Sequence, residues 1–137
     1  MLTLNYKNRL LDTFGSFFNE GDKHAYPTLK LYSIVEGEDV LVATLVMKSP
    51  AFAPARENRL DAYPISSANA LCAGTILKFS LCNKDDYPLY IGYAGTKDQL
   101  IQIGDEEPIK PQLILNTVNV QIETFLEVKS LCFYYAG

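Results

Sequence analysis

His24 is the only histidine of this chain, so any Ser-His-Asp or Cys-His catalytic site would have to use it. It lies in residues 21–27, Gly-Asp-Lys-His-Ala-Tyr-Pro, without a serine in the sequence context of a nucleophile elbow. One imidazole cannot supply the ligand set of a catalytic zinc ion. We therefore expect His24 to be a loop residue at the surface, and the sequence predicts neither a metal site nor a cofactor site.

Acidic side chains gather in three places, and paired carboxylates can hydrolyse glycosides or bind calcium. All three clusters fall in predicted turns, where acidic residues serve turn geometry and solubility. They lack the alternating spacing of a calcium loop, and the glycines form neither GxGxxG nor a P-loop. The sequence therefore predicts no enzyme; one adventitious calcium site, or a lyase or glycosidase that uses an acidic pair, is the alternative. The clusters are Glu36, Glu38 and Asp39; Asp85 and Asp86; and Asp105, Glu106 and Glu107.

The three cysteines, Cys72, Cys82 and Cys132, are widely spaced and odd in number. This pattern predicts neither a disulfide framework nor a zinc site. Each cysteine lies among apolar residues, so we expect free thiols that pack as small hydrophobes. An intermolecular disulfide is the alternative.

Composition and charge limit the class of protein. The 137 residues are 48% hydrophobic and 20% charged, which predicts a single globular domain over residues 1–137. The net charge is −4, and the nearest approach to a basic cluster, Arg56 and Arg59, is diluted by Glu57 and Asp61. Nucleic acid is therefore not an expected partner. No apolar run approaches the ~20 residues of a membrane span, and no signal-peptide pattern is present, so we expect no membrane contact and synthesis in a reducing cytoplasm.

Residues 28–52 carry the clearest structural pattern: an apolar strand, an acidic turn with a glycine, a second apolar strand and a Ser-Pro stop. In the first strand Leu29, Leu31, Ser33 and Val35 fall on one face. Period-two runs of this kind, rich in β-branched and aromatic residues, indicate a β-hairpin. Sheet packing is therefore the expected class of fold.

Further turn-punctuated runs bring the expected total to about eight strands. The predicted fold is all-β, a jelly-roll-like β-sandwich over residues 28–135 with an N-terminal amphipathic helix. The proline-containing connection at residues 49–74 is long enough to be a contact segment, and it includes a short edge strand at 62–65. The last strand is apolar on both faces near its end, so it is either central in the sandwich or buried by another chain. The remaining strands are expected at residues 75–82, with Thr75 on the buried face, and at 87–94, 99–103, 113–115, 118–122 and 125–135.

Residues 5–18 have the apolar spacing of an amphipathic helix of three to four turns, within an N-terminal segment of residues 1–21. Asn5 is the expected N-cap. Such a helix covers one face or end of the sheet, or else it is an arm that docks on a neighbouring subunit. Its aromatic and aliphatic stripe consists of Tyr6, Leu10, Phe14 and Phe17.

An ordered set of short motifs resembles a family of small structural proteins encoded by tailed bacteriophages beside their head and tail genes. The resemblance covers nearly the whole chain. Its motifs are an Asn-x-Leu-Leu-Asp helix (Asn8, Leu10, Leu11, Asp12), a Leu-Lys-Leu-Tyr-Ser strand (residues 29–33), Leu-x-Ala-Thr-Leu (Leu41, Ala43, Thr44, Leu45), Pro-Ala-Phe (Pro50, Ala51, Phe52), Ala-Gly-Thr (Ala73, Gly74, Thr75) and Leu-x-Leu-Asn (Leu113, Leu115, Asn116).

The resemblance implies a virion structural protein, and most of all a decoration (cement) protein on the capsid exterior. Such a protein binds the major capsid protein between capsomers and binds itself as a dimer or trimer. The acidic net charge agrees with an exterior location away from DNA. A tail, baseplate or fibre-tip module that binds a receptor or carbohydrate is the alternative. The predicted contact residues are Tyr6, Leu10, Phe14 and Phe17 of the helix, Phe52, Arg56, Arg59 and Tyr63 of the long connection, and Phe133 and Tyr135 at the end.

Overall fold

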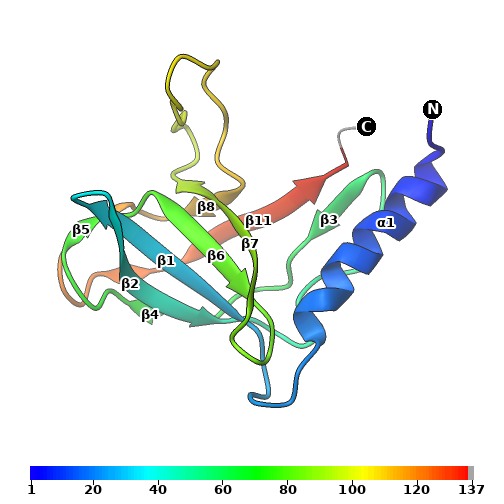
Figure 1. The fold of residues 1–137 in the computed structure, drawn as a ribbon, viewed down its shortest axis with the longest axis horizontal. Helices are drawn as coiled ribbons and strands as arrows, with labels where there is room; N and C mark the ends of the chain where they lie inside the picture. The colour runs from blue at the N-terminus through cyan, green and yellow to red at the C-terminus, as the bar shows by residue number, and fades with distance from the viewer. Residues whose placement is uncertain (136–137) are drawn as a thin grey trace.

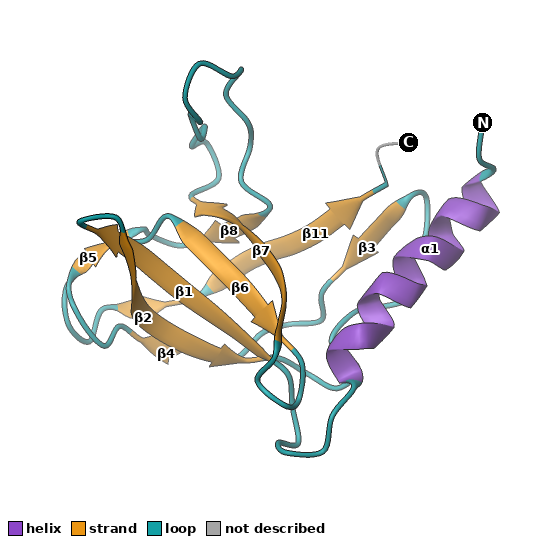
Figure 2. Ribbon diagram, viewed as in Figure 1, coloured by secondary structure: helices purple, strands orange, loops and turns teal. Residues whose placement is uncertain are grey.

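The computed structural model describes residues 1–135 and consists mostly of β-strands, with one α-helix at the N-terminus (Figures 1 and 2). The all-β class with a single N-terminal helix is thus confirmed. The elements in chain order are α1 (Leu4–Ser16), the 3-10 turn η1 (Phe17–Asn19), β1 (Thr28–Val35), β2 (Glu38–Val46), β3 (Arg59–Asp61), β4 (Ala68–Asn69), β5 (Gly74–Thr75), β6 (Lys78–Cys82), β7 (Pro88–Gly95), β8 (Leu113–Leu115), β9 (Asn119–Val120), β10 (Phe125–Leu126) and β11 (Val128–Tyr134).

The main sheet has seven strands in the order β2-β1-β6-β7-β8-β11-β3. Its neighbouring strands are antiparallel except for β7 and β8, which are parallel through Ala94–Leu113 and Gly95–Ile114. Two short ladders, β10 with β4 and β5 with β9, lie at one end of the molecule (Figure 1). The sheet is therefore mixed, and β7 and β8 are the one pair of its neighbouring strands, among the described residues, that run in the same direction.

The hairpin predicted for residues 28–52 is present as β1 and β2. Leu29 and Leu31 are fully buried, as the period-two pattern predicts, whereas Val35 is 53% exposed because it adjoins the turn. The two turn residues, Glu36 and Gly37, both have positive φ. A two-residue turn with this backbone matches the twist of antiparallel strands, so it sets the register of the pair.

Other strands differ from the expectation in their bounds. The segment 75–82 divides into β5 and β6, and Ile76, not the exposed Thr75, is buried between them. The final segment divides into β10 and β11. At residues 99–103 only Ile101 pairs, through an isolated bridge to Ile109, because this segment leaves the sheet and folds on itself. The edge strand of the long connection is β3 and precedes the predicted residues 62–65.

The N-cap of helix α1 is Thr3, two residues before the expected Asn5. The Thr3 hydroxyl accepts a hydrogen bond from the backbone N–H of Tyr6 at 3.3 Å. The helix lies alongside β3 at the edge of the sheet (Figure 1), and Leu11 and Phe18 belong to the same core cluster as the strands. The helix therefore covers an edge of its own sheet, but it does so through Leu11, Phe14 and Phe18. The other three residues of the predicted stripe, Tyr6, Leu10 and Phe17, are exposed.

A cluster of aromatic rings joins the helix to both halves of the sheet. Phe14 lies 5.2 Å from Phe18 and 5.1 Å from Phe133, measured between ring centroids. Phe133 in turn lies 4.9 Å from Tyr90, and Phe18 lies 5.6 Å from Phe52. Most of these pairs meet edge-to-face, the arrangement that the ring quadrupoles favour. The cluster explains why the end of β11 is apolar on a face that no other strand covers: the helix buries it.

Candidate interaction surfaces

Three polar side chains of α1 and η1 hold the long connection against the helix. Each accepts a hydrogen bond from a backbone N–H: Asn8 from Asn58 at 2.9 Å, Asp12 from Ala55 at 2.7 Å and Asn19 from Ala51 at 3.0 Å. These bonds satisfy donors of a segment that has few strand partners of its own. Sequence analysis missed them, although the spacing of four between Asn8 and Asp12 places both on one helix face.

Gly15 permits this close approach. A Cβ atom at this position would lie 3.2 Å from Cδ2 of Leu60 and 3.5 Å from Cβ of Phe52. The position is buried, and the neighbours belong to β3 and to the connection before it. Glycine is a poor helix former, but at this position it lets the helix contact the sheet edge.

On the other side of the helix lies an apolar groove of about 330 Å³ between α1, β7 and the end of β11. We call it the helix groove. Its lining comes chiefly from Leu10 and Phe14 of the helix, Tyr90 of β7, and Phe133, Tyr134 and Tyr135 at the end of the described chain. A single apolar concavity with a few tyrosine hydroxyls suits an apolar side chain of a binding partner.

Two cations border the helix groove. The Lys7 ammonium lies 6.0 Å from the ring centroid of Tyr135, and the Arg59 guanidinium lies 5.5 Å from that of Tyr134. Arg59 also donates to the Tyr134 hydroxyl at 3.1 Å and is paired with Asp61, whose hydrogen bond raises the pKa of Arg59. Lys7 has no acidic partner within 4.0 Å in residues 1–135.

Residues 96–112 form a projecting hairpin, which we call the arm (Figure 1). Ile101 and Ile109 exchange both backbone hydrogen bonds, at 2.7 and 2.9 Å, and this fixes the stem. The Gln102 side chain donates to the carbonyl oxygens of Gly104 and Glu106 at 2.8 and 2.6 Å and so orders the tip. The arm is thus internally hydrogen-bonded, although the sheet does not cover it.

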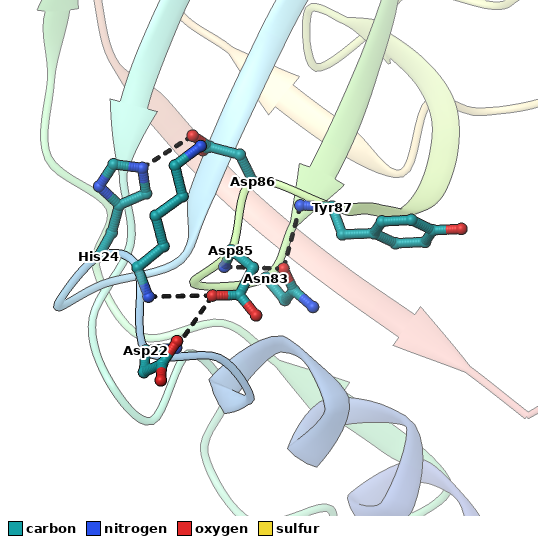
Figure 3. A network of polar contacts seen from close by, with 7 residues as sticks. Asp22, His24, Asn83, Asp85, Asp86 and Tyr87 are labelled. Carbon is teal, nitrogen blue, oxygen red and sulfur yellow. Dashed lines mark hydrogen bonds and ion pairs between the residues drawn. The ribbon is translucent and has the colours of Figure 1, made fainter.

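His24 belongs to a polar network that joins two loops (Figure 3). Its Nε2 atom lies 2.8 Å from Oδ2 of Asp86, and one carboxylate oxygen of Asp85 accepts the backbone N–H groups of Asp22 and Lys23 at 3.0 and 2.9 Å. These two N–H bonds, from Lys23 first and then Asp22, lower the pKa of Asp85, and the His24 bond lowers the pKa of Asp86. His24 is thus a surface loop residue, as expected. The network, which we call the clamp, joins its loop to the 83–87 loop, and the sequence analysis did not predict the pairing of His24 with Asp86.

The ten predicted contact residues divide by burial. Phe52 and Phe133 are only 6% and 7% exposed, so they are corrected to core residues of this chain. The reason is the aromatic cluster, which the helix completes and which one-dimensional patterns do not reveal. Partly buried are Phe14, Tyr63 and Tyr135, whereas Tyr6, Leu10, Phe17, Arg56 and Arg59 are exposed. Their contact role stays a prediction.

An exposed apolar patch, missed from the sequence, lies at the end of the molecule that carries β4 and β10. Leu71, Ile122 and Phe125 are 60%, 69% and 53% exposed. Their two segments lie side by side, because Ala70 exchanges backbone hydrogen bonds with the 123–124 turn, at 2.7 and 2.8 Å. We call these three residues the end patch. In the sequence these three residues look like ordinary strand ends. Their exposure on neighbouring segments becomes visible only once the pairing of the two segments is known.

Other site chemistry was searched in residues 1–135. No group of three or more His, Cys, Asp or Glu there could hold a metal ion, and no helix of this part of the chain is long and apolar enough to cross a membrane. Cys82 is buried, Cys72 and Cys132 are partly buried, and all three thiols are free. Comparison with known proteins adds no relative: no family model, curated protein or solved structure matches the chain.

Proposed function

We propose that this protein is a structural protein of a tailed-bacteriophage virion, made in the host cytoplasm, that decorates the capsid exterior. It binds the major capsid protein between capsomers and stabilises the head. The proposal starts from the ordered motifs of the sequence, from the Asn8–Asp12 helix motif to Leu113, Leu115 and Asn116. Its function is binding, so what it requires of the fold is a rigid scaffold with exposed contact surface.

The observation that carries the proposal is the end patch. Isolated exposed apolar residues are ordinary, but adjacent ones of this size commonly mark a surface that a partner covers. Leu71, Ile122 and Phe125 lie on two segments that backbone hydrogen bonds hold side by side, so their positions are fixed before a partner binds. A preformed apolar surface binds without a large ordering cost. We propose that it contacts the capsid protein.

A net charge of −4 supports the exterior location, because an acidic surface is repelled by packaged DNA. Decoration of this kind stabilises a head by adding buried area across the seams between capsomers, and many equal contacts act together. We also propose a finer description of the fold, a jelly-roll-like sandwich with β2-β1-β6-β7 and β8-β11-β3 as its layers. Leu31 and Phe79 from one layer and Leu113 and Leu131 from the other share one core cluster, which supports it.

Occupancy on heads tests the function. Ile122→Glu should reduce binding of the purified protein to undecorated heads at least tenfold, whereas Tyr87→Ser, at a residue 66% exposed outside the patch, should leave it unchanged. Gold-labelled antibody on intact particles gives the location. Label on tail tips would replace the proposal with the tail or receptor-binding alternative, and absence of label from particles would exclude a virion role.

A further inference from the structure

The main sheet opens between β7 and β11. Only the last two residues of β7, Ala94 and Gly95, pair with β8. Strand β8 pairs with β11 only as far as Leu131, so the last residues of β11 have no partner in β8. Within residues 1–135, the earlier part of β7 therefore has β6 as its one neighbour, and the end of β11 has β3 as its one neighbour. The rings of Tyr90 and Phe133 bridge this opening, with their centroids 4.9 Å apart, and the helix groove lies over them with α1 as one wall.

The arm has the complementary chemistry. Leu100 and Ile109 are 58% and 43% exposed on it, and Asp105, Glu106 and Glu107 form its tip. No basic side chain lies within 4.0 Å of these three carboxylates in residues 1–135. The stem also carries Lys97, Asp98 and Lys110, but its exposed leucine and isoleucine match an apolar groove, and its acidic tip matches an unpaired lysine at the border of that groove. Lys7 is that lysine.

Only the base of the arm, at Gln112, borders the helix groove of its own chain, whereas the rest of the arm projects from the sheet at the top of the view in Figure 1. We propose that the arm of one copy docks in the helix groove of a second copy, with Leu100 on the groove aromatics and the acidic tip near Lys7. The contact uses two different surfaces, so it is heterologous and generates a closed ring or an open chain. The inference rests on the proposed function only in placing this self-association in the virion.

The size of the arm sets the strength of this contact. One hairpin in one groove falls well below the ~800 Å² per partner of a standard stable interface. A single contact is therefore weak, with a dissociation constant on the order of 10–100 μM. Ring closure, or the crowding of copies on a shell, makes the second contact intramolecular and raises the effective affinity.

Sedimentation velocity of the full chain from about 5 to 500 μM tests the contact over that range. The wild type should show concentration-dependent association, and Leu100→Ser and Lys7→Glu should each raise the dissociation constant at least about tenfold. Matched controls are Val35→Ser, which removes an apolar side chain of similar exposure (53% against 58%) outside the groove and the end patch, and Lys48→Glu, which makes the same charge change at another exposed lysine. Both controls should associate as the wild type does.

A mixing experiment identifies the two surfaces. Leu100→Ser has an intact groove and Lys7→Glu an intact arm, so the two variants together should form a 1:1 dimer with the wild-type dissociation constant and nothing larger, whereas each alone should associate at least about tenfold more weakly. Wild-type protein that is monomeric throughout the concentration range overturns the inference, as does association that Leu100→Ser leaves unchanged. Loss of head binding in Lys7→Glu with a monomeric wild type would assign the groove to the capsid protein instead. Head occupancy is measured separately, so failure of the virion role leaves the sedimentation result standing.

Discussion

Truncating Phe18 is the sharpest test of whether the helix belongs to the core. Phe18 is 0% exposed, whereas its neighbour Phe17 is 46% exposed. Its ring lies 5.2 Å from Phe14 and 5.6 Å from Phe52, so Phe18→Ala opens a cavity between the helix and the long connection. Replacing a buried phenylalanine by alanine typically costs about 3–5 kcal/mol.

The matched variant Phe17→Ala removes the same atoms from the surface and should cost less than about 1 kcal/mol. Since domains of this size unfold with about 5–15 kcal/mol, the loss in Phe18→Ala is a large fraction of the total. Each kcal/mol lowers the melting temperature by roughly 4 °C, so the two variants should differ by about 10 °C or more.

Urea unfolding followed by circular dichroism measures both variants, and an unchanged m-value shows that the same cooperative unit unfolds. Equal midpoints for Phe17→Ala and Phe18→Ala would refute the reasoning, because they would mean that the helix is not packed as described. The N-terminal helix would then be better described as a separable segment whose removal leaves a folded sandwich. With the packing described, deletion of residues 1–18 exposes Phe52 and Phe133 and destabilises the sheet.

Asp12→Ala removes the acceptor of the Ala55 N–H and should lower the free energy of unfolding by about 1–2 kcal/mol, whereas Asp12→Asn keeps an acceptor oxygen and should lose less than half of that. Gly21→Ala should cost about 1–3 kcal/mol and speed amide exchange in the clamp, because φ is +112° and the new Cβ would lie 2.8 Å from the Asp85 backbone nitrogen. The pKa values of Asp85 and Asp86 are lowered from 3.8, so their contribution to stability is present above that pH and is lost as the pH falls through the folded-state values. The urea midpoint should therefore fall below about pH 4, and fall less steeply in Asp85→Ala.

Each of these outcomes has a clear opposite. Equal losses in the two Asp12 variants would show that charge, and not the acceptor, matters there. Wild-type exchange rates in Gly21→Ala would show that the loop relaxes without disturbing the clamp. A pH profile that Asp85→Ala leaves unchanged would mean that acid sensitivity arises from other carboxyl groups.

Short-range patterns predicted the local structure well, and long-range packing less well. The hairpin of β1 and β2 follows from alternation and a glycine turn, both of which are local. Residues 99–103 alternate equally well, but they have no neighbouring strand to pair with, so Ile101 pairs within the arm instead. Burial of Phe133 depends on Phe14, which lies far away in the sequence, and no local pattern joins them. Exposure was therefore the property that sequence reasoning assigned worst.

The Asn-x-Leu-Leu-Asp motif has a structural explanation in this chain. Asn8 and Asp12 hold the long connection, Leu11 is buried in the core, and Leu10 lines the helix groove. Asn8, Leu11 and Asp12 thus attach the helix to the rest of the fold. The motif thus accounts for a shared fold more directly than for a shared activity, and the functional proposal depends on the exposed surfaces.

The parallel pairing of β7 and β8 makes a long excursion between them unavoidable, since a parallel neighbour cannot be reached by a tight reversal. Geometry demands the excursion but not its length, because doubling a flexible loop costs only about 0.6 kcal/mol in closure entropy. The apex near Gly104, where an added Cβ would meet no atom within 4 Å, is therefore a natural insertion point for an epitope or reporter peptide.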